Sequence, residues 1–208
     1  MKVIETEADL AAGFQALIAI EPRFHDVRAC VGDLPLRRRT DGFGALLDAI
    51  VGQQVSVASA TAIRGRVVAA GFGEPAPILA APEDDLRACG LSRQKVRYLR
   101  ALAEADVDFN ALRTAPDATV YETLVAISGI GRWTAEMYLL FALGRVDVFA
   151  PDDMALQEGA KLLFDLPERP KGKAMGVMAQ AWSPWRSVAA RALWAYYGHT
   201  KSRQGETL

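Results

Sequence analysis

The sequence contains few of the residues that build metal centres or disulfide frameworks. Its 208 residues include two cysteines, Cys30 and Cys89, and two histidines, His25 and His199. The cysteines lie far apart, and no metal-ligand pattern surrounds them, which argues against a structural zinc, an iron–sulfur cluster or a disulfide framework. We interpret both cysteines as small buried thiols. Any chemistry must then come from carboxylates, bound water or the substrate itself.

Long apolar runs and a strong net charge are also missing. No segment approaches the roughly 20 apolar residues that cross a bilayer, and the polar, acidic start is unlike a signal peptide. We therefore expect a cytoplasmic, intracellular protein that contacts no membrane. The net charge of −1 is uneven: residues 1–33 hold six acids and three bases, and residues 34–208 hold nineteen acids and twenty-one bases. Basic clusters at residues 37–39, 93–100 and 169–173 permit a nucleic-acid footprint without arguing for one.

Extended segments are scarce as well, and only residues 146–149 alternate like a short strand. Elsewhere apolar residues recur at helical spacing, Ser56 and Ser92 stand where N-caps are expected, and three prolines between residues 75 and 82 break the chain. The predicted helices span residues 7–20, 42–55, 56–70, 86–91, 92–102, 118–127, 132–143, 153–163, 171–181 and 184–197. We therefore predict an all-α fold of about ten helices, a single domain over residues 1–208 with two lobes and a cleft between them.

One twelve-residue segment, residues 124–135 (LVAISGIGRWTA), predicts two helices joined by a very short turn. Gly129 can take a positive φ and turn the chain tightly, while Ile130 drops into the core between the helices. Gly131 has no side chain, so the backbone can approach a partner closely where the second helix begins. Amides at a helix start bind anions, and a DNA phosphate suits them whatever the base sequence.

This segment resembles the helix-hairpin-helix of DNA base-excision glycosylases. The resemblance assigns phosphate binding to four hairpin residues, Gly129, Gly131, Arg132 and Thr134. In that superfamily, main-chain carbonyls of the hairpin often also hold a monovalent or divalent cation that bridges to a phosphate. The carbonyls implied in this chain are those of Val125, Ile127 and Ile130.

A carboxylate pair follows the hairpin in the order that defines this superfamily. Asp152 and Asp153 come after a loop that contains Pro151, and Asp153 lies 22 positions beyond Gly131. The resemblance makes Asp153 the catalytic carboxylate, because the family uses the second acid of the pair, and Asp152 would cap the helix or support its neighbour. As a base leaves, the sugar gains positive charge that a nearby anion stabilises, and the same group can direct the attacking water.

Trp133 stands where related enzymes that also cut the DNA backbone carry a lysine, which forms a Schiff base with the sugar. Tryptophan has no amine for that step, so the resemblance implies a monofunctional enzyme that leaves an abasic site. An indole face attracts cationic bases such as 3-methyladenine and 7-methylguanine by roughly 0.5–2 kcal/mol. The resemblance therefore implies excision of alkylated purines that have been flipped out of the duplex.

Two further segments resemble the DNA-3-methyladenine glycosylase II branch of this superfamily. Residues 49–56 (AIVGQQVS) match a stretch that places Gln53 in the base pocket and makes Gln54 the wedge that fills the gap left by the flipped base. Residues 182–187 (WSPWRS) match a branch motif whose downstream tryptophan, here Trp194, forms part of the pocket wall. We interpret two tryptophans of that motif as core packing, namely Trp182 and Trp185. Its arginine, Arg186, could contact a phosphate or brace an acidic residue.

The resemblance covers most of residues 40–198, with three departures. The chain before the Gln-Gln segment is too short for the mixed α/β N-terminal lobe of some members, so an all-helical form is implied. Two pocket positions that are frequently tyrosine are Met137 and Met154 here, which makes the wall more pliable and less attractive to cations. Neutral lesions such as ethenoadenine or hypoxanthine therefore stand beside cationic ones as substrates. Gln54 is polar where an apolar wedge is common, so it would fill the gap by hydrogen bonding.

The implied partner is double-stranded DNA containing damaged bases, acted on by a monomer that is associated with the nucleoid if the source is bacterial. No catalytic cofactor and no iron–sulfur cluster are implied. Two alternative functions stay open. A non-catalytic DNA-binding module would use the hairpin for phosphates alone, but it leaves Asp153 and Trp133 without a reason. A glycosylase/lyase for oxidised bases is disfavoured by Trp133 and by the lack of a cysteine cluster.

Overall fold

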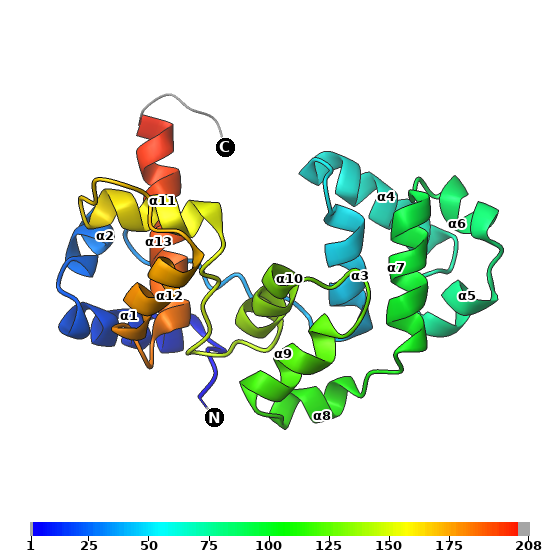
Figure 1. The fold of residues 1–208 in the computed structure, drawn as a ribbon, viewed down its shortest axis with the longest axis horizontal. Coiled ribbons are helices and arrows are strands. Elements are labelled where there is room, and N and C mark those ends of the chain that lie inside the picture. The colour runs from blue at the N-terminus through cyan, green and yellow to red at the C-terminus, as the bar shows by residue number, and fades with distance from the viewer. Residues whose placement is uncertain (1, 204–208) are drawn as a thin grey trace. The chain divides into compact units, whose positions relative to one another are not determined.

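The computed structural model describes residues 2–203, which form two compact units (Figure 1). Unit 1 consists of the described residues up to Arg38 together with those from Gly144 onward, and unit 2 consists of residues 39–143. The helices of unit 1 are α1 (Glu7–Ile20), α2 (Phe24–Val31), α11 (Met154–Leu163), α12 (Gly172–Gln180) and α13 (Arg186–Arg203). The helices of unit 2 are α3 (Phe43–Gly52), α4 (Val57–Ala69), α5 (Pro75–Ala80), α6 (Glu83–Ala88), α7 (Arg93–Glu104), α8 (Phe109–Thr114), α9 (Asp117–Val125), α10 (Arg132–Met137) and the π-helix η1 (Tyr138–Ala142).

The predicted all-α class is confirmed. Within residues 2–203, strand-like pairing is limited to one antiparallel bridge between Val3 and Arg145, and residues 146–149 form no strand. Ser56 and Ser92 are N-caps as expected, accepting hydrogen bonds from the amides of Ser59 and Lys95. No helix of the described chain is long and apolar enough to cross a membrane.

The described residues contain thirteen α-helices and one π-helix, more than the ten expected, because short helices escaped the periodicity. The prolines after α4 were predicted to break the chain, and this prediction was wrong for two of them. Pro75 and Pro77 lie in the first turn of α5, where a missing N–H costs nothing. Helices α2 and α8 span eight and six residues, too few for a repeating apolar face. The expected helix over residues 132–143 changes to π geometry after Met137.

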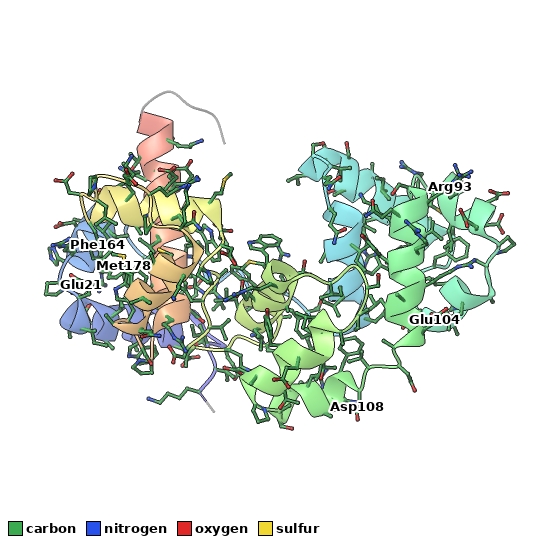
Figure 2. The ribbon with its side chains drawn as sticks, in the orientation of Figure 1. Glu21, Arg93, Glu104, Asp108, Phe164 and Met178 are labelled. Carbon is green, nitrogen blue, oxygen red and sulfur yellow. The ribbon has the colours of Figure 1, made fainter. Side chains whose placement is uncertain are left out.

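The core of unit 1 is an aromatic cluster around Trp182, whose side chain is 1% exposed. Its indole lies 5.6 Å from the rings of Phe24 and Phe149 and stacks on Phe164, which Figure 2 labels at the end of α11. The predicted core role of Trp182 is therefore confirmed. Trp185 is half-buried, and a Cβ at Gly13 of α1 would lie 2.8 Å from its ring.

Helix α13 packs against α1, α2 and α11. Its contact with α11 is close, because a Cβ at Gly159 would lie 2.7 Å from the carbonyl oxygen of Leu193. A glycine at this point lets the two backbones approach.

The interpretation of both cysteines as buried thiols holds for Cys89 and is wrong for Cys30, which is exposed near the end of α2.

Unit 2 is built around α7, which packs against α3, α5 and α6 (Figure 1). Figure 2 labels Arg93 and Glu104 at the two ends of this helix. The apolar residues of α7 that face the core are Val96, Leu99, Leu102 and Ala103. Their i, i+3, i+6 spacing produces one apolar face, and the opposite face carries exposed basic residues.

Candidate functional site

The segment between α9 and α10 forms the predicted hairpin in unit 2. Gly129 has φ +94°, and the amide of Ile130 donates to the carbonyl of Ile127 at 3.0 Å, which closes the turn. Ile127 and Ile130 are buried, so the turn is anchored in the core as expected. Gly131 is the N-cap of α10 with extended backbone, and it has no side chain to bond the first amides of the helix.

The hairpin turn is supported from α7 and from the end of α3. A Cβ at Gly129 would lie 2.3 Å from Cγ of Tyr98, so only glycine fits against this ring. The side-chain amide of Gln53, the C-cap residue of α3, donates from Nε2 to the carbonyl oxygen of Gly129 at 2.9 Å. Sequence reasoning placed Gln53 in a base pocket, and nothing in its pattern pointed to this bond with the hairpin.

The first turn of α10 carries the remaining hairpin residues with different exposures. Trp133 is 50% exposed. Arg132 donates from Nε to Oε1 of Glu136 at 2.8 Å, and that glutamate is 4% exposed. Thr134 is buried, so its side chain lies inside the unit. Met137, one turn after Trp133, is half-buried.

The turn between α3 and α4 presents an exposed tip. Gln54 is exposed and has φ +57°, a left-handed conformation that residues other than glycine seldom adopt. Val55 and Val57 on either side of Ser56 are also exposed, Val57 by 85%. A strained backbone beside exposed apolar side chains is typical of a segment that contacts a partner.

Asp153 lies in unit 1 at the N-cap of α11. Its Oδ1 accepts hydrogen bonds from the amide of Leu156 at 3.0 Å and from Nε1 of Trp194 on α13 at 3.1 Å. The structure thus joins two residues that the sequence assigned to one site. Asp152 was expected to cap this helix or to support its neighbour. The capping alternative was wrong, because Asp153 is the cap, and the exposed Asp152 lies against Gly172. Met154 follows with 65% of its surface exposed.

The loop that leads to Asp153 is tied to the start of α13. The amide of Ser187 donates to the carbonyl of Val146, and its hydroxyl bonds both the amide and the carbonyl of Val148. Nearer the carboxylate, Gln157 donates from Nε2 to the carbonyl of Pro151 at 2.7 Å. Sequence reasoning missed Gln157 and the role of Ser187, because hydrogen bonds to main-chain atoms have no sequence signature outside helix caps and turns.

Arg186 braces an acid, which is one of the two roles left open by the sequence. Its guanidinium contacts both oxygens of Asp147, with Nε at 2.7 Å and Nη2 at 3.0 Å, and Ser183 adds a third donor at 2.8 Å. Burial raises the pKa of the Asp147 carboxyl, but these bonds and the positive charge of Arg186 outweigh it and leave the pKa below its ordinary value. Asp147 is therefore an ionised anchor of the loop.

The fold and the two sites define a class: an all-helical protein with a helix-hairpin-helix turn and, further along the chain, a carboxylate at a helix start. Residues 47–187 match the model of the HhH-GPD superfamily base excision DNA repair proteins. The chain belongs to this family.

Relatives and solved structures agree with this membership. The chain is 32% identical over 166 residues to DNA-3-methyladenine glycosylase 1 of Schizosaccharomyces pombe, covering 75% of this chain and 72% of that protein. It is 31% identical to DNA-3-methyladenine glycosylase 2 of Escherichia coli, covering 74% of this chain and 56% of that protein. This chain matches only about half to three fifths of the length of several curated relatives.

Among solved structures, a DNA-3-methyladenine glycosidase from Bacillus halodurans superposes with a TM-score of 0.81 and 32% identity, over 99% of this chain and 96% of that one. The Schizosaccharomyces pombe 3-methyladenine DNA glycosylase in complex with abasic DNA superposes with a TM-score of 0.76 and 28% identity, over 88% and 95% of the two chains. The all-α fold predicted from the sequence is therefore that of known 3-methyladenine glycosylases.

Proposed function

We propose that this protein is a monofunctional DNA glycosylase that hydrolyses the N-glycosyl bond of alkylated purines in duplex DNA and leaves an abasic site. The observation that carries the proposal is the carboxylate of Asp153 at the start of α11, which accepts two hydrogen bonds. The relatives of this chain are named DNA-3-methyladenine glycosylases. The substrates proposed are 3-methyladenine and 7-methylguanine, with the neutral bases ethenoadenine and hypoxanthine as further candidates.

Asp153 would act on the sugar. The bonds from the Leu156 amide and from Trp194 hold its carboxylate in one orientation, and charge-assisted bonds of this kind are stronger than neutral ones. Loss of the base gives the sugar oxocarbenium character, which a fixed anion stabilises without reorganising. The same carboxylate can orient or deprotonate the water that attacks C1′.

Five side chains are proposed to bind the flipped base: Gln53, Trp133, Met137, Met154 and Trp194. Trp133 is 50% exposed and Met154 is 65% exposed, so both side chains are accessible to a bound base, which supports this assignment. Trp133 would stack on the base and favour cationic purines, while the methionines supply an adaptable wall. Trp133 has no amine, which supports hydrolysis without a Schiff base.

The hairpin is proposed to grip a DNA phosphate through main-chain amides at the start of α10, with Gly131 allowing close approach. Arg132 would add a positive charge at this position, whereas Thr134 is buried and would contribute through its main chain. Gln54 would enter the gap left by the flipped base.

The carbonyls of Val125, Ile127 and Ile130 are proposed to hold a cation at the hairpin. Val125 ends α9, so its carbonyl belongs to the last turn of a helix, where oxygens lack intrahelical donors. The carbonyl of Ile127 already accepts the amide of Ile130 and has one lone pair left. Neutral oxygen donors of this kind suit a hard cation. The described residues hold no group of three or more histidine, cysteine or acidic side chains that could bind a metal instead.

The test compares wild type with Asp153→Asn on duplexes that each carry one defined lesion, and it measures the free base released. Asparagine keeps the cap of α11, so a folded variant without base release supports the proposal. Asp152→Asn is the matched control and should keep wild-type activity. Release by Asp153→Asn at the wild-type rate would overturn the role of Asp153.

Borohydride reduction separates the mechanisms. A monofunctional enzyme forms no Schiff base, so no protein–DNA adduct should be trapped. An efficient yield of trapped adduct would instead establish the glycosylase/lyase alternative. Binding to every duplex with no base released from any lesion would establish the non-catalytic module.

A further inference from the structure

Two exposed segments of unit 2, the hairpin turn and the tip between α3 and α4, are both supported by one helix, α7. The ammonium of Lys95 donates to the carbonyl oxygen of Val51 at 2.7 Å, close to the end of α3. One turn further along α7, the ring of Tyr98 lies under Gly129 of the hairpin. Residues three apart on a helix share a face, so α7 supports both segments from the same side.

Lys95 is an unusual group to find here. It is buried, at 9% exposure, and burial lowers the pKa of its ammonium. A lysine is seldom buried without a strong partner, and here the partner is a carbonyl at the negative end of a helix dipole. Lys95 thus holds the last turn of α3, two residues before Gln53.

The contacts among α7, the end of α3 and the hairpin form a closed ring. Lys95 holds Val51, the chain continues to Gln53, and Gln53 donates to the carbonyl of Gly129. Gly129 packs against Tyr98, which lies on the same helix as Lys95, one turn further along α7. The side chain of Gln94 adds a bond to the hydroxyl of Tyr98 at 2.5 Å, which holds the ring against the hairpin. The exposed Gln54 directly follows this ring of contacts.

We infer that Lys95 and Tyr98 are positioning residues that hold the hairpin turn and the Gln54 tip in fixed register with each other. The inference rests on the proposed function for its consequence: DNA gripped at the hairpin would then meet Gln54 at a set distance. Neither residue needs to touch the damaged base, because each acts through a main-chain segment that is proposed to contact DNA.

The experiment uses Lys95→Met, with Arg100→Met as its matched control. Arg100 also lies on α7 and donates to a main-chain carbonyl, that of Ala81 at 2.8 Å, which belongs to the end of α5 and to neither exposed segment. Below the unfolding temperature, Lys95→Met should slow single-turnover base release about tenfold, the effect of losing one buried bond to a charged group. Arg100→Met should release base within about twofold of wild type, and Lys95→Arg should recover most of the rate.

Hydrogen exchange gives a readout that does not depend on activity. In Lys95→Met, the amides of residues 52–57 and 127–131 should exchange faster, while Arg100→Met should affect residues near 79–83. Wild-type base release by Lys95→Met, or exchange that rises uniformly over residues 39–143, would overturn the inference. If wild type releases no base from any lesion, the proposed function fails, and the exchange pattern alone decides whether the two segments are held together.

Discussion

Trp194 donates its indole N–H to Oδ1 of Asp153 at 3.1 Å, although 41 positions separate the two residues in the chain. The same oxygen accepts the amide of Leu156 and so caps α11. Helices α11 and α13 pack closely within unit 1, which keeps the donor and the carboxylate together. The indole is therefore an orienting donor to Asp153, a contact that comes in addition to the pocket-wall role proposed for it.

Trp194→Phe removes this donor and retains an aromatic ring. We expect single-turnover base release to fall about tenfold to a hundredfold, because a bond to a charged group is worth roughly 1.5–3 kcal/mol. Trp185→Phe is the control, since Trp185 packs on Gly13 of α1 and takes no part in the bonds that Leu156 and Trp194 make to Asp153. This variant should release base at the wild-type rate. A wild-type rate in Trp194→Phe would show that the bond does not orient Asp153 for the reaction.

Trp133→Ala tests the stacking face. Loss of a cation–π contact worth roughly 0.5–2 kcal/mol should lower excision of 7-methylguanine about 2-fold to 30-fold more than excision of neutral hypoxanthine. The measurement is the ratio of single-turnover rates on the two lesions. Equal losses on both would mean that Trp133 contributes packing without preferring cations.

Two glycine variants separate folding from DNA contact at the hairpin. Gly129→Ala should destabilise the protein by about 2–4 kcal/mol, because the backbone is left-handed and the new methyl group meets the ring of Tyr98. Gly131→Ala should change the free energy of unfolding by less than about 1 kcal/mol, since its Cβ meets no atom within 4 Å, yet it should weaken DNA binding.

Thermal unfolding and a duplex titration check both glycine variants. Unchanged DNA affinity in Gly131→Ala would argue against close approach of a phosphate to the start of α10.

Gln54→Gly tests whether backbone strain at the tip serves the reaction. Glycine adopts φ +57° without steric cost, so stability should stay level or rise by up to about 1 kcal/mol, whereas base release should fall because the proposed wedge is gone. Asp106→Gly is the control, since Asp106 also has a positive φ and follows α7 away from the tip. A fully active Gln54→Gly variant would remove Gln54 as the wedge.

Asp147→Asn should make stability less dependent on acid. The pKa of Asp147 is lower in the folded protein than its ordinary value of 3.8, so its contribution is complete above that value and disappears as the pH falls through the folded pKa. At pH 7 we expect the variant to lose about 1–2 kcal/mol, and the difference should shrink below about pH 4.

Asp33→Asn is the comparison for Asp147→Asn. Its partner is Arg28 in an exposed pair, which should contribute less than about 1 kcal/mol. A difference between wild type and Asp147→Asn that persists unchanged into acid would contradict the ionised anchor.

Local features were predictable where a residue acts on its own neighbourhood. Ser56 and Ser92 cap the helices they precede, and Gly129 turns with positive φ, because caps and turns depend on a few consecutive residues. Helices of six to eight residues, such as α5 and α8, were missed because they show too little of an apolar repeat.

By itself, the sequence determined the helical class, the hairpin, the family and the acid proposed for catalysis, because each depends on residue type and spacing along the chain. Tertiary structure alone decided that Trp194 bonds Asp153, that Arg186 braces Asp147, and that Gln53 and Tyr98 support the hairpin. These contacts join residues about 30 to 76 positions apart, and the bond from Gln53 ends on a main-chain carbonyl, a group that every residue possesses. Side-chain identity cannot encode such a bond, so only the packing of helices selects its partner.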